Sequence, residues 1–92
     1  SNPLPEISSR RKGIGNINIE IMKDGVPAQG IRVTVKSGGK IVGNDVTSMQ
    51  GHTTFQLLYG MYTGVIHNES GILSSFDFKL EEPEITHTVS IP

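Results

Sequence analysis

Short runs of residues along this chain alternate between hydrophobic and polar side chains, which is typical of β-strands that bury one face. The clearest run places Ile17, Ile19 and Ile21 at every second position, with polar residues at positions 18 and 20. The hydrophobic residues are largely β-branched, which favours strands and disfavours helices. We therefore expect strands at 17–22, 31–36, 40–47, 52–57, 61–67, 72–80 and 85–91.

Glycines separate these runs and indicate where the chain turns. The segments 24–25 (Asp-Gly) and 37–39 (Ser-Gly-Gly) are typical of tight turns. Gly51 and Gly60 stand where a turn needs a positive φ, which glycine adopts without steric cost. Gly43 lies inside an expected strand instead, and there it predicts a bulge or the close approach of another backbone.

Two of the expected strands supply the aromatic part of the core. Phe55 and Leu57 lie two residues apart and are predicted to face inward together. The strand at 72–80 is less regular, with Ser74 as a polar residue on its inner face and Leu73 as an apolar residue on its outer face. Its inward-facing side chains are expected to be Ile72, Phe76, Phe78 and Leu80.

The fold class that follows is all-β. About seven antiparallel strands need a cover for their common apolar face, and a second packed sheet provides it most simply. We therefore expect an immunoglobulin-like or prealbumin-like sandwich of two sheets. A small closed barrel is the competing architecture.

Composition narrows the possible partners. The chain has 92 residues, a formal net charge of −1 and no cysteine. Nucleic-acid binders usually carry a strongly basic face, so no nucleic-acid partner is expected. No apolar run is long enough to span a membrane, so no membrane insertion is expected either. The absence of cysteine excludes disulfides, thiolate metal sites and cysteine nucleophiles.

The beginning of the chain differs from the rest. Residues 1–13 contain two prolines, a basic triplet at 10–12 and no periodicity, which predicts a disordered lead-in that serves as a linker. Ser1 and Asn2 look like a scar left by cleavage of a tag. We therefore expect one β-sandwich domain at 14–92, excised from a longer protein.

The residues that could carry chemistry are dispersed. His52, His67 and His87 lie in three different expected strands and form no metal-binding pattern. No serine stands in the sequence frame of a catalytic nucleophile. We therefore expect no enzyme activity, no metal and no cofactor. Asn68-Glu69-Ser70 matches the acceptor pattern for glycosylation, which has a meaning only in a secreted eukaryotic protein.

Two residues are candidates for contact with a partner. Tyr59 and Met61 flank Gly60 at an expected turn, and their parity points away from the core. Tyrosine is a frequent anchor in interfaces because it offers a large area at a low entropy cost. The alternative is that both side chains only cap the end of the sandwich.

The order and spacing of several motifs resemble a known family. They are DGVPAQGIRVTV at 24–35, Thr47, GHTTFQL at 51–57 and GMY at 60–62. Together they resemble the carboxypeptidase regulatory-like domain and its relatives, the collagen-adhesin B-type repeats and transthyretin-like folds. The match spans most of 15–91, although each motif alone is loose. The resemblance implies a seven-stranded prealbumin-like sandwich that acts as a non-catalytic appendage of enzymes, receptors and surface proteins.

Within that resemblance, Tyr62 matches a tyrosine whose buried ring lets its hydroxyl bind nearby backbone. Adhesin repeats that form an internal isopeptide bond use a lysine on the first strand, a position that Lys23 could fill. They also use an acidic catalyst where this chain has Ile66, and an Asn or Asp near the last strand, which 85–91 does not contain. We therefore expect no cross-link. Transthyretin-related hydrolases end in Tyr-Arg-Gly-Ser, whereas this chain ends in Val-Ser-Ile-Pro.

Three function classes remain. The preferred one is a non-catalytic accessory module that binds, spaces or tethers within a larger secreted or cell-surface protein, with a protein or carbohydrate partner and neighbouring domains of its own chain. The first alternative is a structural domain of a fibre, pilus or virion. The second is a small-ligand carrier or an enzyme.

Overall fold

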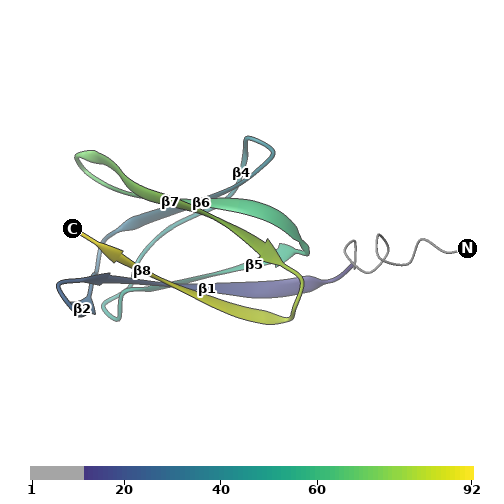
Figure 1. Ribbon diagram of the computed structural model, residues 1–92, viewed down its shortest axis with the longest axis horizontal. Coiled ribbons are helices and arrows are strands. Elements are labelled where there is room, and N and C mark those ends of the chain that lie inside the picture. Colours follow the sequence, from purple (N-terminus) through teal and green to yellow (C-terminus); the bar gives the residue numbers. More distant parts are fainter. Residues whose placement is uncertain (1–11) are drawn as a thin grey trace, which may run out of the picture.

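The computed structural model describes residues 12–92 and shows two stacked layers of strands (Figure 1). The strands are β1 (Ile14–Lys23), β2 (Val26–Pro27), β3 (Arg32–Ser37), β4 (Lys40–Val46), β5 (His52–Leu58), β6 (Gly60–Asn68), β7 (Gly71–Leu80) and β8 (Glu84–Ile91). The all-β sandwich is therefore confirmed, and the two-residue β2 is an addition to the seven expected strands. Most of the expected lead-in, residues 1–11, lies outside the described residues.

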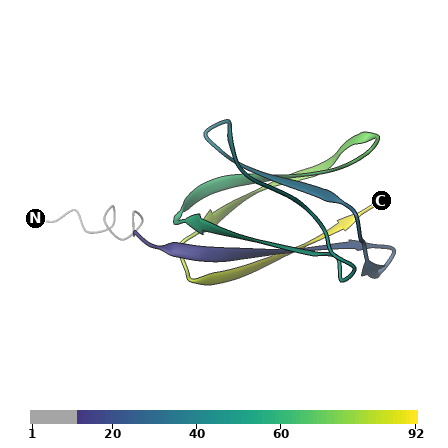
Figure 2. The same ribbon diagram turned by 180° about the vertical axis from the view of Figure 1, so that it is seen from behind.

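Each layer is one sheet. In the first, here called the β1 sheet, β1 pairs with β8, β5 and the short β2. In the second, the β3 sheet, the strands lie in the order β4-β3-β6-β7. Seen from behind, the same two layers of strands are stacked on each other (Figure 2).

One pairing differs from the expected antiparallel arrangement. Strand β8 runs parallel to β1, in a register that joins Asn16 to Glu84 and Lys23 to Ile91. The reason is that β7 belongs to the other sheet, so the loop after β7 crosses the sandwich and delivers β8 beside β1 instead of folding it back as a hairpin. Consequently β1 begins at one end of the sandwich and β8 ends at the opposite end (Figure 1).

The core lies between the sheets and is built mainly from aliphatic side chains. The side chains of Ile17, Ile19 and Ile21 on β1 are fully buried, as their alternation predicted. Val33, Val35, Ile66 and Leu80 meet them from the β3 sheet and are also fully buried. Burying a side chain of this size typically contributes about 1.5–3 kcal/mol, so these residues dominate the stability of the fold.

The inner face of β7 differs from the prediction at its start. Ile66 pairs with Ser74 while His67 pairs with Ile72, so Leu73 is an extra residue in a bulge. A single extra residue reverses the alternation on its far side. The expected orientation is therefore wrong for two residues, because Ile72 is 73% exposed and Leu73 packs against the core.

Gly43 lies beside a bulge, as predicted, but its close neighbour is a side chain and not another backbone. It pairs with Val35, whereas Lys36 pairs with Ile41, which leaves Val42 as an extra residue in a bulge. A Cβ atom at Gly43 would also lie 2.6 Å from Cδ1 of Phe55 on the opposite sheet. The missing side chain thus lets β4 approach the half-buried ring of Phe55.

Candidate functional site

The turn between β5 and β6 carries the two residues predicted to contact a partner. Met61 is 63% exposed. Tyr59 is different, because its ring packs against the core and its backbone N–H donates to the carbonyl oxygen of Gly13 at 2.8 Å. The prediction that Tyr59 points away from the core is therefore wrong, because Tyr59 continues the inward parity of Phe55 and Leu57. Whether either residue binds a partner remains a prediction.

Tyr62 fixes this turn, as its motif implied. Its hydroxyl donates to the carbonyl oxygen of Leu58, and its ring stacks on Phe78 with centroids 5.4 Å apart. Burial raises the pKa of the Tyr62 hydroxyl, so the group stays protonated and keeps donating at neutral pH. The turn is therefore tied to β5, and Met61 stands on a well-defined part of the surface.

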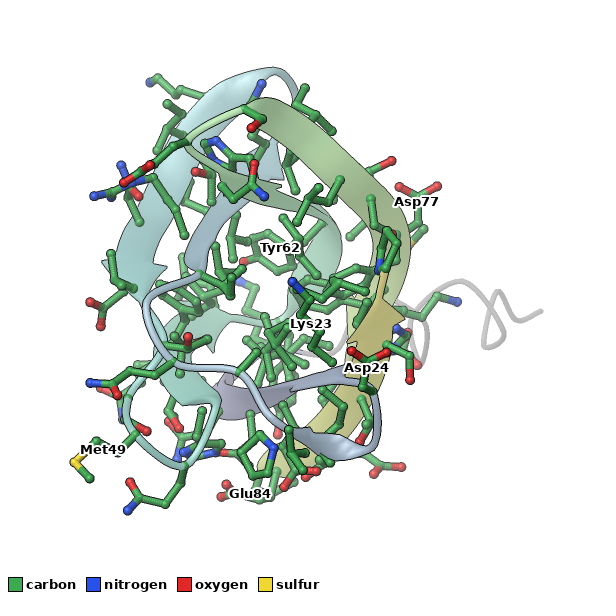
Figure 3. All side chains as sticks on the ribbon, turned by 90° about the vertical axis from the view of Figure 1, so that its left-hand side faces the viewer. Lys23, Asp24, Met49, Tyr62, Asp77 and Glu84 are labelled. Carbon is green, nitrogen blue, oxygen red and sulfur yellow. The ribbon has the colours of Figure 1, made fainter. Side chains whose placement is uncertain are left out.

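Met61 borders a cavity of about 280 Å³ on the outer face of the β3 sheet, which we call the Met61 cavity. Cross-strand pairing aligns Lys36, Thr63 and Asp77 there, and the hydroxyl of Thr63 donates to Oδ1 of Asp77 at 2.8 Å. In Figure 3, Asp77 points outward from the sandwich, whereas Tyr62 lies between its layers. The cavity is lined by Lys36, Gly38, Met61, Tyr62, Thr63 and Asp77.

The side chains at the Met61 cavity place charged groups beside an apolar one. The thioether of Met61 lies near the cationic Lys36 and the carboxylate of Asp77. The cavity therefore offers an apolar surface together with one positive and one negative charge. Asp77 is exposed, and a general acid or base in an enzyme usually needs a site that excludes water.

A second cavity, of about 290 Å³, lies at the other end of the same face and is called the Arg32 cavity. Pairing of β3 with β6 places Arg32 directly opposite His67. The guanidinium of Arg32 donates from Nη1 to Oδ1 of Asn44 at 2.7 Å, and Nε2 of His67 lies 3.1 Å from the hydroxyl oxygen of Thr34. The lining residues are Gly30, Arg32, Val46, His67, Asn68 and Glu69.

Sequence reasoning missed the Arg32 cavity. Arg32 and His67 are far apart in the chain, and each looks like an isolated polar residue on a strand. The register of β3 against β6 places Arg32 opposite His67. To predict the Arg32 cavity from sequence, one would first have to predict that these two strands pair.

The outer face of the β1 sheet carries a network of polar side chains across β8, β1 and β5. Nδ2 of Asn18 donates to Oε2 of Glu84 at 2.6 Å, and Nδ2 of Asn16 donates to Oε1 of Glu84 at 3.3 Å. Hydrogen bonds from Asn18 and then Asn16 lower the pKa of Glu84. Thr54 donates to Asn18 at 2.8 Å, and Thr88 donates to Glu20 at 3.0 Å. Figure 3 shows Glu84 at the outer edge of this face.

The three histidines lie in separate places. His52 lies on β5, and His67 lines the Arg32 cavity on β6. His87 is on β8 and stacks on the ring of Phe76. Within residues 12–92, no three or more His, Cys, Asp or Glu side chains lie close enough together to hold a metal ion.

Lys23 and Ile66, at the positions that an isopeptide bond would use, lie on β1 and β6. Lys23 is exposed at the end of β1, beside Ile91, and Figure 3 looks onto that end of the sandwich. Ile66 is fully buried on β6. Residues 12–92 contain no helix with the length and apolar character needed to span a membrane.

Comparison by sequence gives no relative, since no protein-family model matches the chain and no curated protein matches it significantly. Comparison of structures does find similar folds. The 5-hydroxyisourate hydrolase of Klebsiella pneumoniae has a TM-score of 0.70 and 20% identity, over 84% of this chain and 89% of the hydrolase chain.

Two longer Bacillus proteins contain a similar unit. BcpA, the major pilin subunit of Bacillus cereus, has a TM-score of 0.68 and 17% identity, over 85% of this chain and 29% of BcpA. The Bacillus anthracis TIE protein has a TM-score of 0.67 and 16% identity, over 85% of this chain and 16% of TIE. At these identities the similarity shows the fold, and the fold of this chain is a prealbumin-like β-sandwich.

Proposed function

We propose that this chain is a non-catalytic accessory module, which spaces, tethers or binds within a larger secreted or cell-surface protein. The observation that carries the proposal is the parallel pairing of β1 with β8. It makes β1 begin at one end of the sandwich and β8 end at the other (Figure 1). A module built this way extends a chain of domains along its own long axis, as a spacer requires.

The similarity to BcpA and TIE supports the same function. In both proteins the matched unit is a small part of a longer chain, 29% of BcpA and 16% of TIE. The fold thus occurs as one domain among others. Because BcpA is a pilin subunit, a structural domain of a fibre or pilus is the second candidate function.

The hydrolase neighbour calls for a separate test, because one fold supports many functions. Purified chain would be mixed with 5-hydroxyisourate, and its decay followed by absorbance beside the K. pneumoniae enzyme. We expect the chain to leave the spontaneous rate unchanged. A rate that rises in proportion to the chain concentration would replace the accessory function with an enzymatic one.

The deciding experiment deletes residues 14–92 from the longer protein that we propose carries them, with a flexible Gly/Ser linker of equal length as the replacement. We expect activity on a small soluble substrate to be retained, and surface attachment or partner binding to be lost. Loss of fibre or pilus formation would favour the structural alternative. Lost turnover with normal attachment would contradict both.

The Met61 cavity is the proposed contact surface for a protein partner. Met61→Ala should weaken partner binding, and Met49→Ala is a matched control because Met49 is also exposed, at 72%, and lies on a different turn. Each change should alter the free energy of unfolding by less than about 0.5 kcal/mol. Equal binding by wild type and Met61→Ala would move the contact away from this cavity.

A further inference from the structure

The β1–β8 pair joins the first and the last strand of the sandwich directly. The parallel register runs over eight consecutive pairs, from Asn16 and Glu84 to Lys23 and Ile91. Both strands run in the same direction, so the start of β1 and the end of β8 lie at opposite ends of the paired region (Figure 1).

This arrangement decides how the fold responds to tension. A force that pulls the start of β1 one way and the end of β8 the other way makes the two strands slide along each other. All the hydrogen bonds between the strands then carry the force together, whereas a force that peels the strands apart breaks them one after another. We infer that the β1–β8 pair is a tension-resisting junction, which keeps the sandwich folded when it is pulled along its length.

Side chains reinforce the junction on the outer face. Nδ2 of Asn18 donates both to Glu84 at 2.6 Å and to the carbonyl oxygen of Ile85 at 3.3 Å. Asn16 adds a bond to Glu84 at 3.3 Å, and Thr88 adds one to Glu20 at 3.0 Å. Each of these hydrogen bonds joins β1 to β8, so sliding would have to break them together with the backbone bonds.

The inner face opposes sliding through packing. Ile17, Ile19 and Ile21 are fully buried on β1, and Ile91 on β8 is 6% exposed. Sliding either strand would move these side chains out of their places in a close-packed core. Strand β5 also pairs with β1, from Ile14 to Glu20, so β1 is held by a second neighbour. The strand that receives the force is therefore the most strongly held one of its sheet.

The inference rests on the proposed spacer function for its biological meaning, but its test needs only this chain. The sequence has no cysteine, so two introduced cysteines define where a force is applied. In a variant with Lys12→Cys and Pro92→Cys, the force acts before the start of β1 and after the end of β8, so the two strands are pulled to slide along each other. Lys23→Cys with Pro92→Cys places both attachments at one end, because Lys23 pairs with Ile91, and it loads the same junction in peeling.

Single-molecule force spectroscopy at one pulling speed then compares the two proteins, after equal melting temperatures have shown that both fold alike. Forced unfolding reports the unfolding rate along the pulled direction. We expect the Lys12/Pro92 pair to unfold at a force several times that of the Lys23/Pro92 pair. Equal forces in the two directions would overturn the inference.

A second variant tests the side-chain contribution. Glu84→Ala removes the acceptor of two bonds between the strands, and Glu82→Ala is a control of equal charge change in the preceding loop. We expect Glu84→Ala to lower the unfolding force in the sliding geometry only, and Glu82→Ala to change neither force. An equal loss in both geometries would show that Glu84 acts on general stability, which contradicts its role in the junction.

The two proposals can fail separately. A low sliding force would remove the junction and leave the deletion test of the accessory function unaffected. Catalytic activity of the chain would remove the accessory function, and the force measurement would still report on the junction.

Discussion

The ring of Phe76 stacks on the imidazole of His87, with centroids 4.1 Å apart and planes 5° apart. Phe76 belongs to β7 and His87 to β8, so this contact joins the two sheets at the edge where the chain crosses between them. Aromatic pairs of this kind contribute about 0.5–1.5 kcal/mol beyond the area they bury.

His87→Ala should therefore lower the free energy of unfolding by about 1 kcal/mol. His52→Ala is the matched control, because His52 is a half-buried histidine that forms none of the ring contacts found among residues 12–92. Its cost should stay within about 0.5 kcal/mol. Urea denaturation measures both values, and equal costs would show that the stacking contributes nothing.

Gly43 and Phe55 should be energetically coupled. Gly43→Ala would bring a Cβ atom to 2.6 Å from the Phe55 ring, so we expect a cost of about 1–3 kcal/mol. Phe55→Ala should cost about 3 kcal/mol, because the ring is half-buried against the core. With the ring removed the clash disappears, and the double variant should cost clearly less than the sum. Additive costs in denaturant titrations would contradict this account of the close approach.

Two buried threonines should respond in opposite ways to replacement by valine. Within the described residues, the hydroxyl of Thr53 is buried without a hydrogen-bond partner, so Thr53→Val should be neutral or stabilise by up to about 1 kcal/mol. The hydroxyl of Thr47 donates to Ala28 at 2.6 Å and accepts from the N–H of Ile31 at 2.9 Å. Thr47→Val should cost about 1–3 kcal/mol. Calorimetry decides, and a destabilised Thr53→Val would reveal a partner for that hydroxyl.

Glu84 should make stability depend on pH. Its pKa is lowered in the folded chain by hydrogen bonds from Asn18 and Asn16, so its contribution is present above the ordinary carboxyl pKa and is lost as the pH falls through the lowered value. Glu84→Gln should thus show a smaller fall in Tm than wild type between about pH 6 and about pH 3. Identical curves for wild type and Glu84→Gln would exclude this role.

The intact mass should equal the mass calculated from the sequence. Ile66 occupies the position where the resemblance would require a carboxylic acid, and an alkyl side chain cannot transfer a proton. Mass spectrometry of the denatured chain checks this directly. A loss of one ammonia or one water would reveal an internal bond.

The sequence predicts features that neighbouring residues determine better than features that depend on contacts between distant strands. Strand positions follow from local alternation, and the burial of Ile17, Ile19 and Ile21 agrees with it. The reversal at Ile72 and Leu73 could not be anticipated, because a bulge depends on how β7 meets β6 and leaves no clear signal in β7 alone.

The candidate sites were harder to predict for the same reason. Met61 was identified from its place beside a turn glycine, but its charged neighbours Lys36 and Asp77 come from two other strands. The prediction that places Tyr59 at the surface groups it with Met61, whereas Tyr59 shares the inward parity of Phe55 and Leu57. The alternation of β5 instead extends to Tyr59, whose backbone N–H donates to Gly13 and whose ring packs against the core.

The two bulges have a consequence for how copies of this chain meet one another. Val42 interrupts β4 and Leu73 interrupts β7, and these are the two edge strands of the β3 sheet. A flat, regular edge invites another strand to extend the sheet, and a bulge prevents this by twisting the edge and breaking the hydrogen-bonding register. Both edges of the sheet that exposes Ile41 and Ile72 are protected in this way, so copies of this chain at high concentration should resist joining into aggregates.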